Sequence, residues 1–320
     1  MSHEPVMKPI DQALPPHTRV DRYRIESTLG GGGFGIVYLA RDRANGTRVI
    51  IKEYMPGKLA HREANHQVRP SGEAEARRFN HGRTLFLQEA SALAKLKHPN
   101  IVHVVNFFRA NGTVYMAMEF QAGSNLQLYI RRRGGFLSAR FLQTVFPPLL
   151  DGLRIIHGSD LLHLDIKPSN VHIRPGGQPL LLDFGAVHGF PKSRQDQLGQ
   201  VISPGFSPIE QYEPNGYVGP WSDIYAIGAT MRACIEGHPP PSARERHERD
   251  TMRSAMVAFR KLYPESLLRA IDWAMEVDPT LRPQRVDELL AALTKPSADE
   301  QSESSSPLER LVGSLPWGKG

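Results

Sequence analysis

The sequence contains a single cysteine, Cys234, among its 320 residues. One cysteine excludes an internal disulfide and is typical of proteins from a reducing compartment, so we expect a cytoplasmic protein. Cys234 follows the apolar helical pattern YAIGATMRA, which favours a buried and unreactive thiol over a reactive one.

Long apolar runs are also missing, since none approaches the ~18 residues that a membrane-spanning helix needs. The start, MSHEPVMKPIDQALPP, has no basic segment followed by an apolar one, so no signal peptide is expected. The net charge of +6 would suit nucleic acid or another acidic partner. However, the basic clusters at 131–133 and 244–249 lack interleaved aromatic residues. We interpret both as solvated surface and expect neither a nucleic-acid partner nor a membrane segment.

The chain changes character near residues 120–124. Before this point β-branched and aromatic residues predict strands, with one helical pattern at 83–97 between them. The predicted strands cover 23–29, 36–40, 47–54, 102–108 and 113–120. After this point helical patterns dominate, and they cover 141–157, 222–236, 265–276 and 284–293. The sequence therefore predicts an α+β fold.

These patterns divide the chain into three parts. We expect an N-terminal extension over residues 1–21, a folded domain over 22–295 and a tail over 296–320. Within the domain, a β-rich lobe covers about 22–119 and an α-rich lobe about 124–295.

The tail begins with a linker of disordered composition and ends with an apolar stripe. Its apolar residues are Leu308, Leu311, Val312, Leu315 and Trp317. The first four have the spacing of one helical face, which predicts a short docking helix at 308–317, on the same chain or on a partner. A frayed tail fits the same residues equally well.

A glycine cluster in LGGGGFGIVY has the spacing G-x-G-x-x-G-x-V, formed by Gly30, Gly32, Gly35 and Val37. Glycine lets backbone N–H groups approach phosphate oxygens because it has no Cβ. Rossmann dehydrogenases use a similar motif, but a helix follows it there. Here FGIVYLA predicts a strand instead of a helix. The sequence also lacks an acidic residue at the end of a second parallel strand, so a nucleotide-binding dehydrogenase is the weakest of the three functions that we consider.

A set of polar groups after this motif suits phosphoryl transfer. It consists of Lys52, Glu89, Asp165, Lys167, Asn170 and Asp183. Lys52 lies on the next predicted strand, and Glu89 on the following helix is the carboxylate expected to orient it. The two residues are 37 positions apart, which predicts an extended connection between them. Together the groups supply a phosphate-binding lysine, two metal-ligating groups and a catalytic aspartate.

With these motifs the sequence resembles the Hanks-type, eukaryotic-like protein kinases, particularly the bacterial serine/threonine kinases. The resemblance runs from about Tyr23 to Leu293 and includes HPNIV, MEF, HLDIKPSN, DFG, SPGFSPIEQY, SDIYAIGAT and DPTLRPQ. It implies a bilobal protein kinase fold, with a small antiparallel β-rich N-lobe that has one main helix and a larger α-helical C-lobe. It also implies ATP and Mg²⁺, or Mn²⁺ in its place, as cofactors and serine or threonine residues of proteins as substrates.

The resemblance further implies a nucleotide site. Its residues would be Leu29, Gly30, Gly32, Gly35, Val37, Lys52, Met118, Glu119, Gln121, Asn170 and Asp183. The glycines would cover the phosphates, and Lys52, paired with Glu89, would hold the α- and β-phosphates. Met118 would be the gatekeeper, and Glu119 and Gln121 would offer backbone groups to adenine. Asn170 and Asp183 would bind the metal.

The catalytic roles come from the same resemblance. Asp165 would orient the substrate hydroxyl and accept its proton, and Lys167 would neutralise the γ-phosphate. Lys167 and Ser203 indicate a serine/threonine rather than a tyrosine kinase. Further implied contacts are an ion pair between Glu210 and Arg282, a tie from Asp223 to the catalytic loop, and a regulatory spine of Leu93, Val104, His163 and Phe184.

Three features depart from the family pattern: Leu164 replaces the arginine of His-Arg-Asp, Ile209 replaces the proline of Ala-Pro-Glu, and the connection after Lys52 is long. Leu164 cannot gather a phosphate, so we expect activity that does not depend on phosphorylation of the activation segment. That segment would instead order through Val187, Phe190, Leu198, Val201 and Ile202.

Since every catalytic group is present, we expect an active kinase that also phosphorylates itself. The alternative is a pseudokinase that acts as an ATP-binding scaffold.

Overall fold

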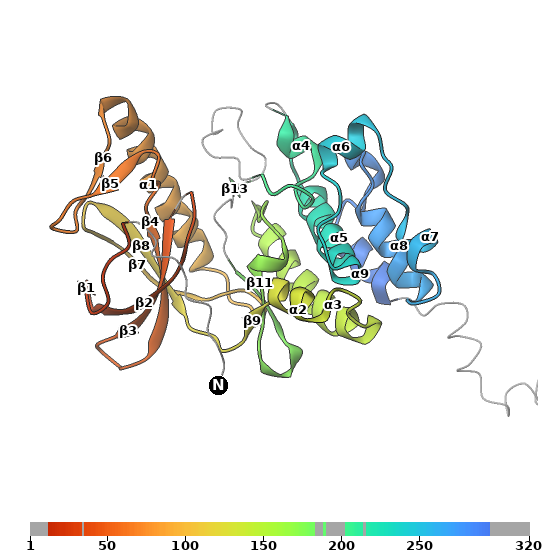
Figure 1. The fold of residues 1–320 in the computed structure, drawn as a ribbon, viewed down its shortest axis with the longest axis horizontal. Coiled ribbons are helices and arrows are strands. Elements are labelled where there is room, and N and C mark those ends of the chain that lie inside the picture. The colour runs from red at the N-terminus through yellow and green to blue at the C-terminus, as the bar shows by residue number, and fades with distance from the viewer. Residues whose placement is uncertain (1–11, 34, 183–187, 190–201, 214–215, 295–320) are drawn as a thin grey trace, which may run out of the picture. The chain divides into compact units, whose positions relative to one another are not determined.

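The structure is a computed structural model that describes residues 12–33, 35–182, 188–189, 202–213 and 216–294 (Figure 1). The chain divides into two compact units. Unit 1 comprises residues 1–124, 155–163 and 170–201, and unit 2 comprises 125–154, 164–169 and 202–320. The lobe boundaries expected from the sequence stay a prediction.

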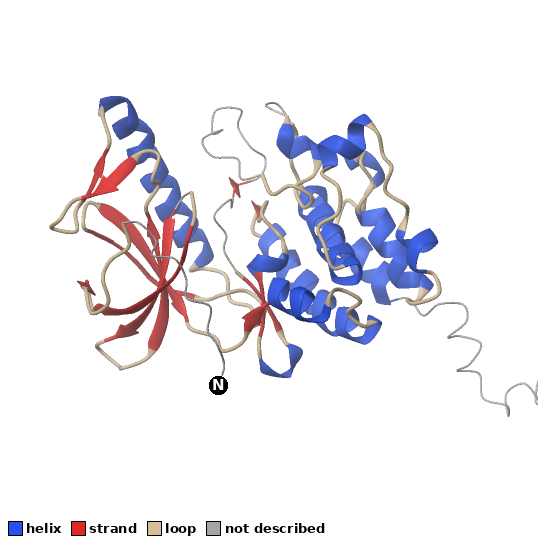
Figure 2. Ribbon diagram, viewed as in Figure 1, coloured by secondary structure: helices blue, strands red, loops and turns tan. Residues whose placement is uncertain are grey.

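Unit 1 contains a six-stranded antiparallel sheet with the order β1-β2-β3-β4-β8-β7 (Figure 2). Its strands are β1 (Arg19–Val20), β2 (Tyr23–Gly31), β3 (Gly35–Asp42), β4 (Arg48–Tyr54), β7 (Val104–Ala110) and β8 (Thr113–Glu119). The alternation that predicted the strands is visible in β3, where Ile36, Tyr38 and Ala40 are buried and the residues between them are not. The five strands predicted in this part of the sequence are confirmed.

The connection after Lys52 differs from the expected extended segment. It contains a hairpin of β5 (Ala60–Arg62) and β6 (Val68–Pro70), followed by the helix α1 (Glu73–Leu93). The helix begins ten residues before the predicted start at 83. Two glutamates in its first turn interact favourably with the positive end of the helix dipole. Phe79 lies with Phe86 on the buried face of the helix. Figure 1 shows the hairpin beside the start of α1.

The remaining elements of unit 1 are short. The strands β11 (Val171–Ile173) and β12 (Pro179–Leu181) pair antiparallel around the 3₁₀ turn η2 (Pro175–Gly177). The strand β10 (Leu161–Leu162) pairs with β13 (His188–Gly189). Two further elements include residues of both units, the short strand β9 (Ser124–Asn125) and the 3₁₀ turn η1 (Pro168–Asn170).

Unit 2 is helical. Its helices are α2 (Leu126–Arg133), most of α3 (Ala139–His157), α4 (Ile209–Tyr212), α5 (Pro220–Glu236), α6 (Ala243–Glu248), α7 (Ala255–Phe259), α8 (Glu265–Ala274), η3 (Pro279–Leu281) and α9 (Val286–Thr294). The central helix is α5, in which every residue from Ser222 to Ile235 is buried. A helix that is buried on all sides must lie in the core. It ends at Gly237, whose φ of 87° is the left-handed conformation that glycine adopts readily.

Two expectations about single residues have opposite outcomes. Cys234 is completely buried, which confirms a core cysteine, and burial raises the pKa of its thiol. The interpretation of residues 244–249 as solvated surface is wrong for Arg246, which is 8% exposed. The Arg246 guanidinium donates to Asp250, to the Tyr225 hydroxyl and to the Met275 carbonyl, and these partners compensate for its burial.

None of the helices in the described part of the chain is both long and apolar enough to span a bilayer.

Candidate active site

The sheet of unit 1 aligns three of the predicted nucleotide-binding residues in one row. Gly30 on β2 is opposite Val37 on β3, and Val37 is opposite Lys52 on β4. Lys52 is in turn opposite Met116 on β8. Directly opposed residues of antiparallel strands point to the same face of a sheet, so Gly30, Val37 and Lys52 share a face.

The packing around Gly35 differs from the packing around Gly30 and Gly32. A Cβ on Gly35 would lie 2.2 Å from the carbonyl oxygen of Glu53, so packing between β3 and β4 requires glycine there. A Cβ on Gly30 or Gly32 would meet no described atom within 4 Å. Packing therefore does not explain these two glycines, and the expected contact of their backbone with a phosphate stays a prediction. Leu29, before the loop, is 42% exposed and leaves an apolar side chain available to a ligand.

Lys52 and Glu89 both belong to unit 1 and are both half-buried. Lys52 lies in the middle of β4, and Glu89 lies on α1 beside Ala90, a residue of the buried face of the helix. Their pairing stays a prediction.

The predicted adenine-binding segment follows the gatekeeper position at the end of β8. Met118 is 8% exposed and lies opposite Ile50 and Val104. The N–H of Glu119 donates to the carbonyl of His103 and is therefore not available to adenine. Gln121 follows two residues after Glu119, and its side-chain amide lies 3.4 Å from the Glu119 carboxylate.

One of the two predicted metal ligands, Asn170, lies at the edge of the β11–β12 hairpin. Asn170 ends η1 and is 6% exposed. Its carbonyl accepts the N–H of Leu182 at 2.8 Å, which places Asn170 beside the residue that precedes Asp183. Asp183 itself lies outside the described residues, as does Phe184 of the expected spine. Amide and carboxylate oxygens suit Mg²⁺, so this pair fits the expected metal.

The other expected spine residues are buried: Leu93 and Val104 are 1% and 3% exposed, and His163 is completely buried. A ring nitrogen of His163 is 3.1 Å from the carbonyl of Leu182.

In unit 2, Asp165 and Lys167 form a triangle with Ser203. The Ser203 hydroxyl donates to Asp165 Oδ1 at 2.7 Å, and Lys167 Nζ lies 2.9 Å from both Asp165 Oδ1 and Ser203 Oγ. The side chain of Asp165 is 8% exposed and that of Lys167 is 25% exposed. The structure thus brings together the predicted catalytic aspartate, the predicted lysine and a hydroxyl group.

Leu164 holds an unusual backbone conformation directly before Asp165. Its φ of 57° lies in the left-handed region, and its side chain is 5% exposed. The Leu164 N–H donates to Asp223 Oδ1 at 2.7 Å, which confirms the expected tie from α5. The Leu164 carbonyl accepts the side-chain amide of Gln211 at 2.9 Å. Gln211 was not predicted from the sequence, because no local pattern specifies a contact between residues 47 positions apart.

The expected ion pair between Glu210 and Arg282 is present. Arg282 contacts both carboxylate oxygens of Glu210 at 2.8 and 3.1 Å, and the two side chains are 5% exposed or less. Ser222 also donates to Glu210, and Arg282 lies over the ring of Tyr225. The pair therefore anchors α4 to the residues that follow α8.

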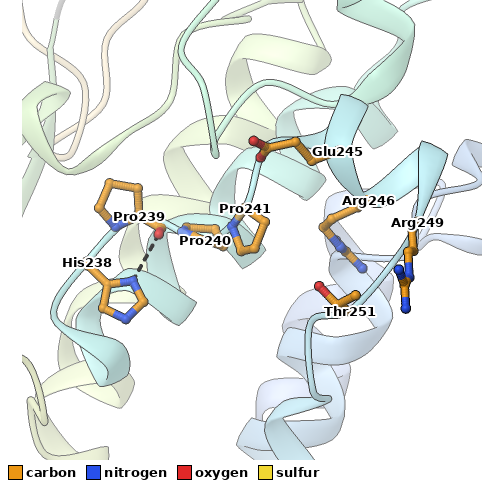
Figure 3. Close-up of a pocket in the computed structure, with 8 residues that line it drawn as sticks. All are labelled: His238, Pro239, Pro240, Pro241, Glu245, Arg246, Arg249 and Thr251. Atoms are coloured by element: carbon orange, nitrogen blue, oxygen red, sulfur yellow. Dashed lines mark hydrogen bonds between the residues drawn. The ribbon is translucent and has the colours of Figure 1, made fainter.

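A separate pocket of about 430 Å³ lies beside α6 (Figure 3). It is lined by His238, Pro239, Pro240, Pro241, Glu245, Arg246, Arg249 and Thr251. None of the predicted site residues lines it, so this pocket is not the expected nucleotide site.

Comparisons with known proteins agree with the motifs. Residues 23–294 match the protein kinase domain family. A solved structure described as "PpkA-294 apo form" is similar with a TM-score of 0.77 and 36% identity, over 88% of this chain and all of that one. This similarity confirms the expected protein kinase fold.

Two bacterial relatives carry serine/threonine kinase names. The probable serine/threonine-protein kinase PkwA of Thermomonospora curvata is 29% identical over 93% of this chain and 37% of the relative. Serine/threonine-protein kinase F of Synechocystis sp. is 31% identical over 68% of this chain and 44% of the relative. This chain therefore spans less than half the length of either protein. The chain belongs to the protein kinase domain family, as a Hanks-type domain related to the bacterial serine/threonine kinases.

Proposed function

We propose that this domain transfers the γ-phosphate of Mg-ATP to serine and threonine hydroxyls of protein substrates and also phosphorylates itself. The observation that carries the proposal is the triangle of Asp165, Lys167 and Ser203. The cytoplasmic location inferred from the single cysteine is part of the same proposal.

The triangle suits acceptance of a hydroxyl proton. A general base must lie within hydrogen-bond reach of the proton that it accepts, and the Ser203 hydroxyl shows that such a group fits 2.7 Å from Asp165 Oδ1. A substrate hydroxyl that donates to the Asp165 carboxylate would be oriented for attack and would lose its proton to it. The Lys167 ammonium beside this carboxylate would neutralise charge on the transferred group.

The nucleotide would be held by residues of unit 1. Gly30 and Gly32 would bring backbone N–H groups to the phosphates, and Lys52, on the face shared with Gly30 and Val37, would contact the α- and β-phosphates. Asn170 and Asp183 would hold Mg²⁺, which neutralises phosphate charge when bound.

Control through phosphorylation of the activation segment is not expected. Leu164 offers no charge to a phosphate, and its backbone is held by Asp223 and Gln211 instead. Five apolar residues were expected to order this segment. Ile202 is 40% exposed, and the other four lie outside the described residues: Val187, Phe190, Leu198 and Val201.

The test separates the roles of two aspartates. Asp165→Ala should abolish transfer and leave ATP affinity nearly unchanged, because Asp165 faces the hydroxyl and not the nucleotide. Asp183→Ala should weaken magnesium-dependent ATP binding, because it removes a metal ligand. Intact-mass analysis after incubation with Mg-ATP measures transfer, and calorimetry measures ATP binding. Asp287→Ala, a change of an aspartate on the exposed face of α9, is the matched control.

Wild-type turnover by Asp165→Ala on any protein substrate would contradict the assignment. ATP binding by the wild-type protein without any phosphate transfer would instead support a scaffold.

A further inference from the structure

Glu53, the neighbour of Lys52 on β4, is a charged residue in the core of unit 1. Successive residues of a strand point to opposite faces, so Glu53 lies on the face opposite Lys52. It is completely buried, and its carboxylate accepts hydrogen bonds from the hydroxyls of Tyr38 and Tyr115 and from the guanidinium of Arg62. We call these four residues the Glu53 network. It joins three neighbouring strands, β3, β4 and β8, to the hairpin.

Arg62, at the end of β5, connects this carboxylate to two further segments. Its Nη2 lies 2.6 Å from Glu53 Oε2, its Nη1 donates to the His66 carbonyl, and its Nε donates to the Gln12 carbonyl. The Gln12 side chain accepts the backbone N–H of Arg62 at 2.8 Å. Each of the three guanidinium nitrogens thus has a partner, at 5% side-chain exposure.

The two phenols and the guanidinium of this network stay protonated at neutral pH. Burial and the charge of Glu53 raise the pKa of Tyr38 and of Tyr115 far above its ordinary value, so both phenols remain donors. Burial alone would lower the pKa of Arg62, but the charge and hydrogen bond of Glu53 outweigh it and the net shift is upward.

Stability alone is a weak reason for such a pair. Removing two charges from water costs about as much as their attraction returns, and apolar residues of similar volume often serve a core equally well. A buried ion pair does impose one arrangement on the segments that it joins. The question is therefore which segments the Glu53 network fixes.

The hairpin leads directly into α1, the helix that carries Glu89. The N–H of Val68 on β6 donates to the Asn111 carbonyl, and Arg83 on α1 donates to the carbonyl of the next residue, Gly112. Hairpin and helix are thus tied to the same turn between β7 and β8. On β4, the ring of Tyr54 packs against Phe79 and Phe86 of α1 at centroid distances of 5.5 and 5.9 Å.

We propose that the Glu53–Arg62 pair is a positioning device that fixes β4 and the hairpin relative to each other, and so sets Lys52 for the nucleotide phosphates. Glu53 directly follows Lys52 on β4. Arg62 is the last residue of β5, which lies on the path of the chain from Lys52 to α1. The inference rests on the proposed role of Lys52. It assigns a task to the long connection that departs from the family pattern.

The test replaces the pair without leaving a buried charge. In the double variant Glu53→Gln with Arg62→Met, the glutamine amide can still bond both phenols and methionine fills the volume of the arginine stem. The fold should survive, because neutral replacement of a buried pair is well tolerated. ATP affinity, measured by calorimetry, should fall about fivefold or more. Adenosine affinity should change less than about twofold, because adenosine has no phosphates for Lys52 to contact.

The matched control is Glu26→Gln with Arg41→Met, which removes a half-exposed pair, 2.7 Å apart, from the same sheet. It should leave both affinities at the wild-type values. A second comparison places the Glu53–Arg62 double variant in a Lys52→Met background. If the pair acts through Lys52, it should have no further effect on ATP affinity there.

Each result has one meaning. An unchanged ATP affinity in the double variant, or an equal loss for ATP and adenosine, overturns the positioning role and leaves the proposed function intact. The positioning role is likewise overturned if the double variant lowers ATP affinity equally in the wild-type and the Lys52→Met backgrounds. If Lys52→Met alone leaves ATP affinity unchanged, the proposed role of Lys52 fails first. If the double variant does not fold, Arg62→Lys replaces it, because lysine keeps the charge but loses the contacts to Gln12 and His66.

Discussion

Leu164 is expected to make the activity independent of phosphorylation in the activation segment. Leucine in the left-handed conformation costs roughly 1–2 kcal/mol. Two hydrogen bonds oppose this cost: the one from the Leu164 N–H to the Asp223 carboxylate is worth about 1.5–3 kcal/mol and the one from Gln211 about 0.5–1.5 kcal/mol. Burial of the leucine side chain contributes a further ~1.5–3 kcal/mol. The conformation before Asp165 is thus held without a phosphate.

The perturbation is removal of every phosphate. Between Ala186 and Ile202 the only hydroxyl side chain is that of Ser193, which lies outside the described residues. The assay compares initial rates on an exogenous substrate for untreated protein, phosphatase-treated protein and Ser193→Ala. All three rates should agree within about twofold, because the ~2–4.5 kcal/mol of the two hydrogen bonds exceeds the backbone cost.

Gln211→Met is the matched variant, since it removes the amide that bonds Leu164 but keeps the side-chain volume. It should lower the rate with and without phosphatase treatment. A drop of tenfold or more after phosphatase treatment or in Ser193→Ala, with folding intact, would refute the reasoning.

Two further predictions concern the rest of the chain. Glu210→Gln should destabilise the domain by about 3–5 kcal/mol in urea unfolding, because it leaves the buried Arg282 without its counter-charge. Glu265→Gln, which breaks an exposed pair with Arg269, should cost only about 0–1 kcal/mol, and equal losses would contradict the argument. The tail, outside the described residues, should show slowed hydrogen exchange over 308–317 if its apolar stripe docks on this chain. Complete exchange at the earliest time point, with and without nucleotide, would exclude that docking.

The elements that could be predicted from sequence are those with a long, clean period. Alternation over β3 and β4 identified both strands, and the apolar run of α5 with its terminal glycine identified the central helix. The first ten residues of α1 were missed because Glu, Ala and Arg dominate there and give no apolar face apart from Phe79. Helices such as α6, with six residues, are too short to show a period.

The site residues were predictable where chemistry dictates the residue type at a fixed local spacing. Asp165 and Lys167 lie two positions apart, and the structure brings them together. Ser203 and Gln211 reach the same loop from 38 and 47 residues away along the chain. No local pattern specifies such contacts, because they depend on how α4 and the segment before it pack in unit 2.

Glu53 shows that a charged residue at a core position of a strand pattern predicts a buried cluster of polar partners. In β4 the residues at 49, 51 and 53 share one face, and the first two are the buried apolar residues Val49 and Ile51. The alternation therefore assigns the third position, a glutamate, to the core. Local and global preferences normally agree, and a charge in a core position needs specific partners. Tyr115 lies directly opposite on β8, and Arg62 arrives from the hairpin nine residues later. Only the three-dimensional pairing names these partners, but the period alone predicts that they exist.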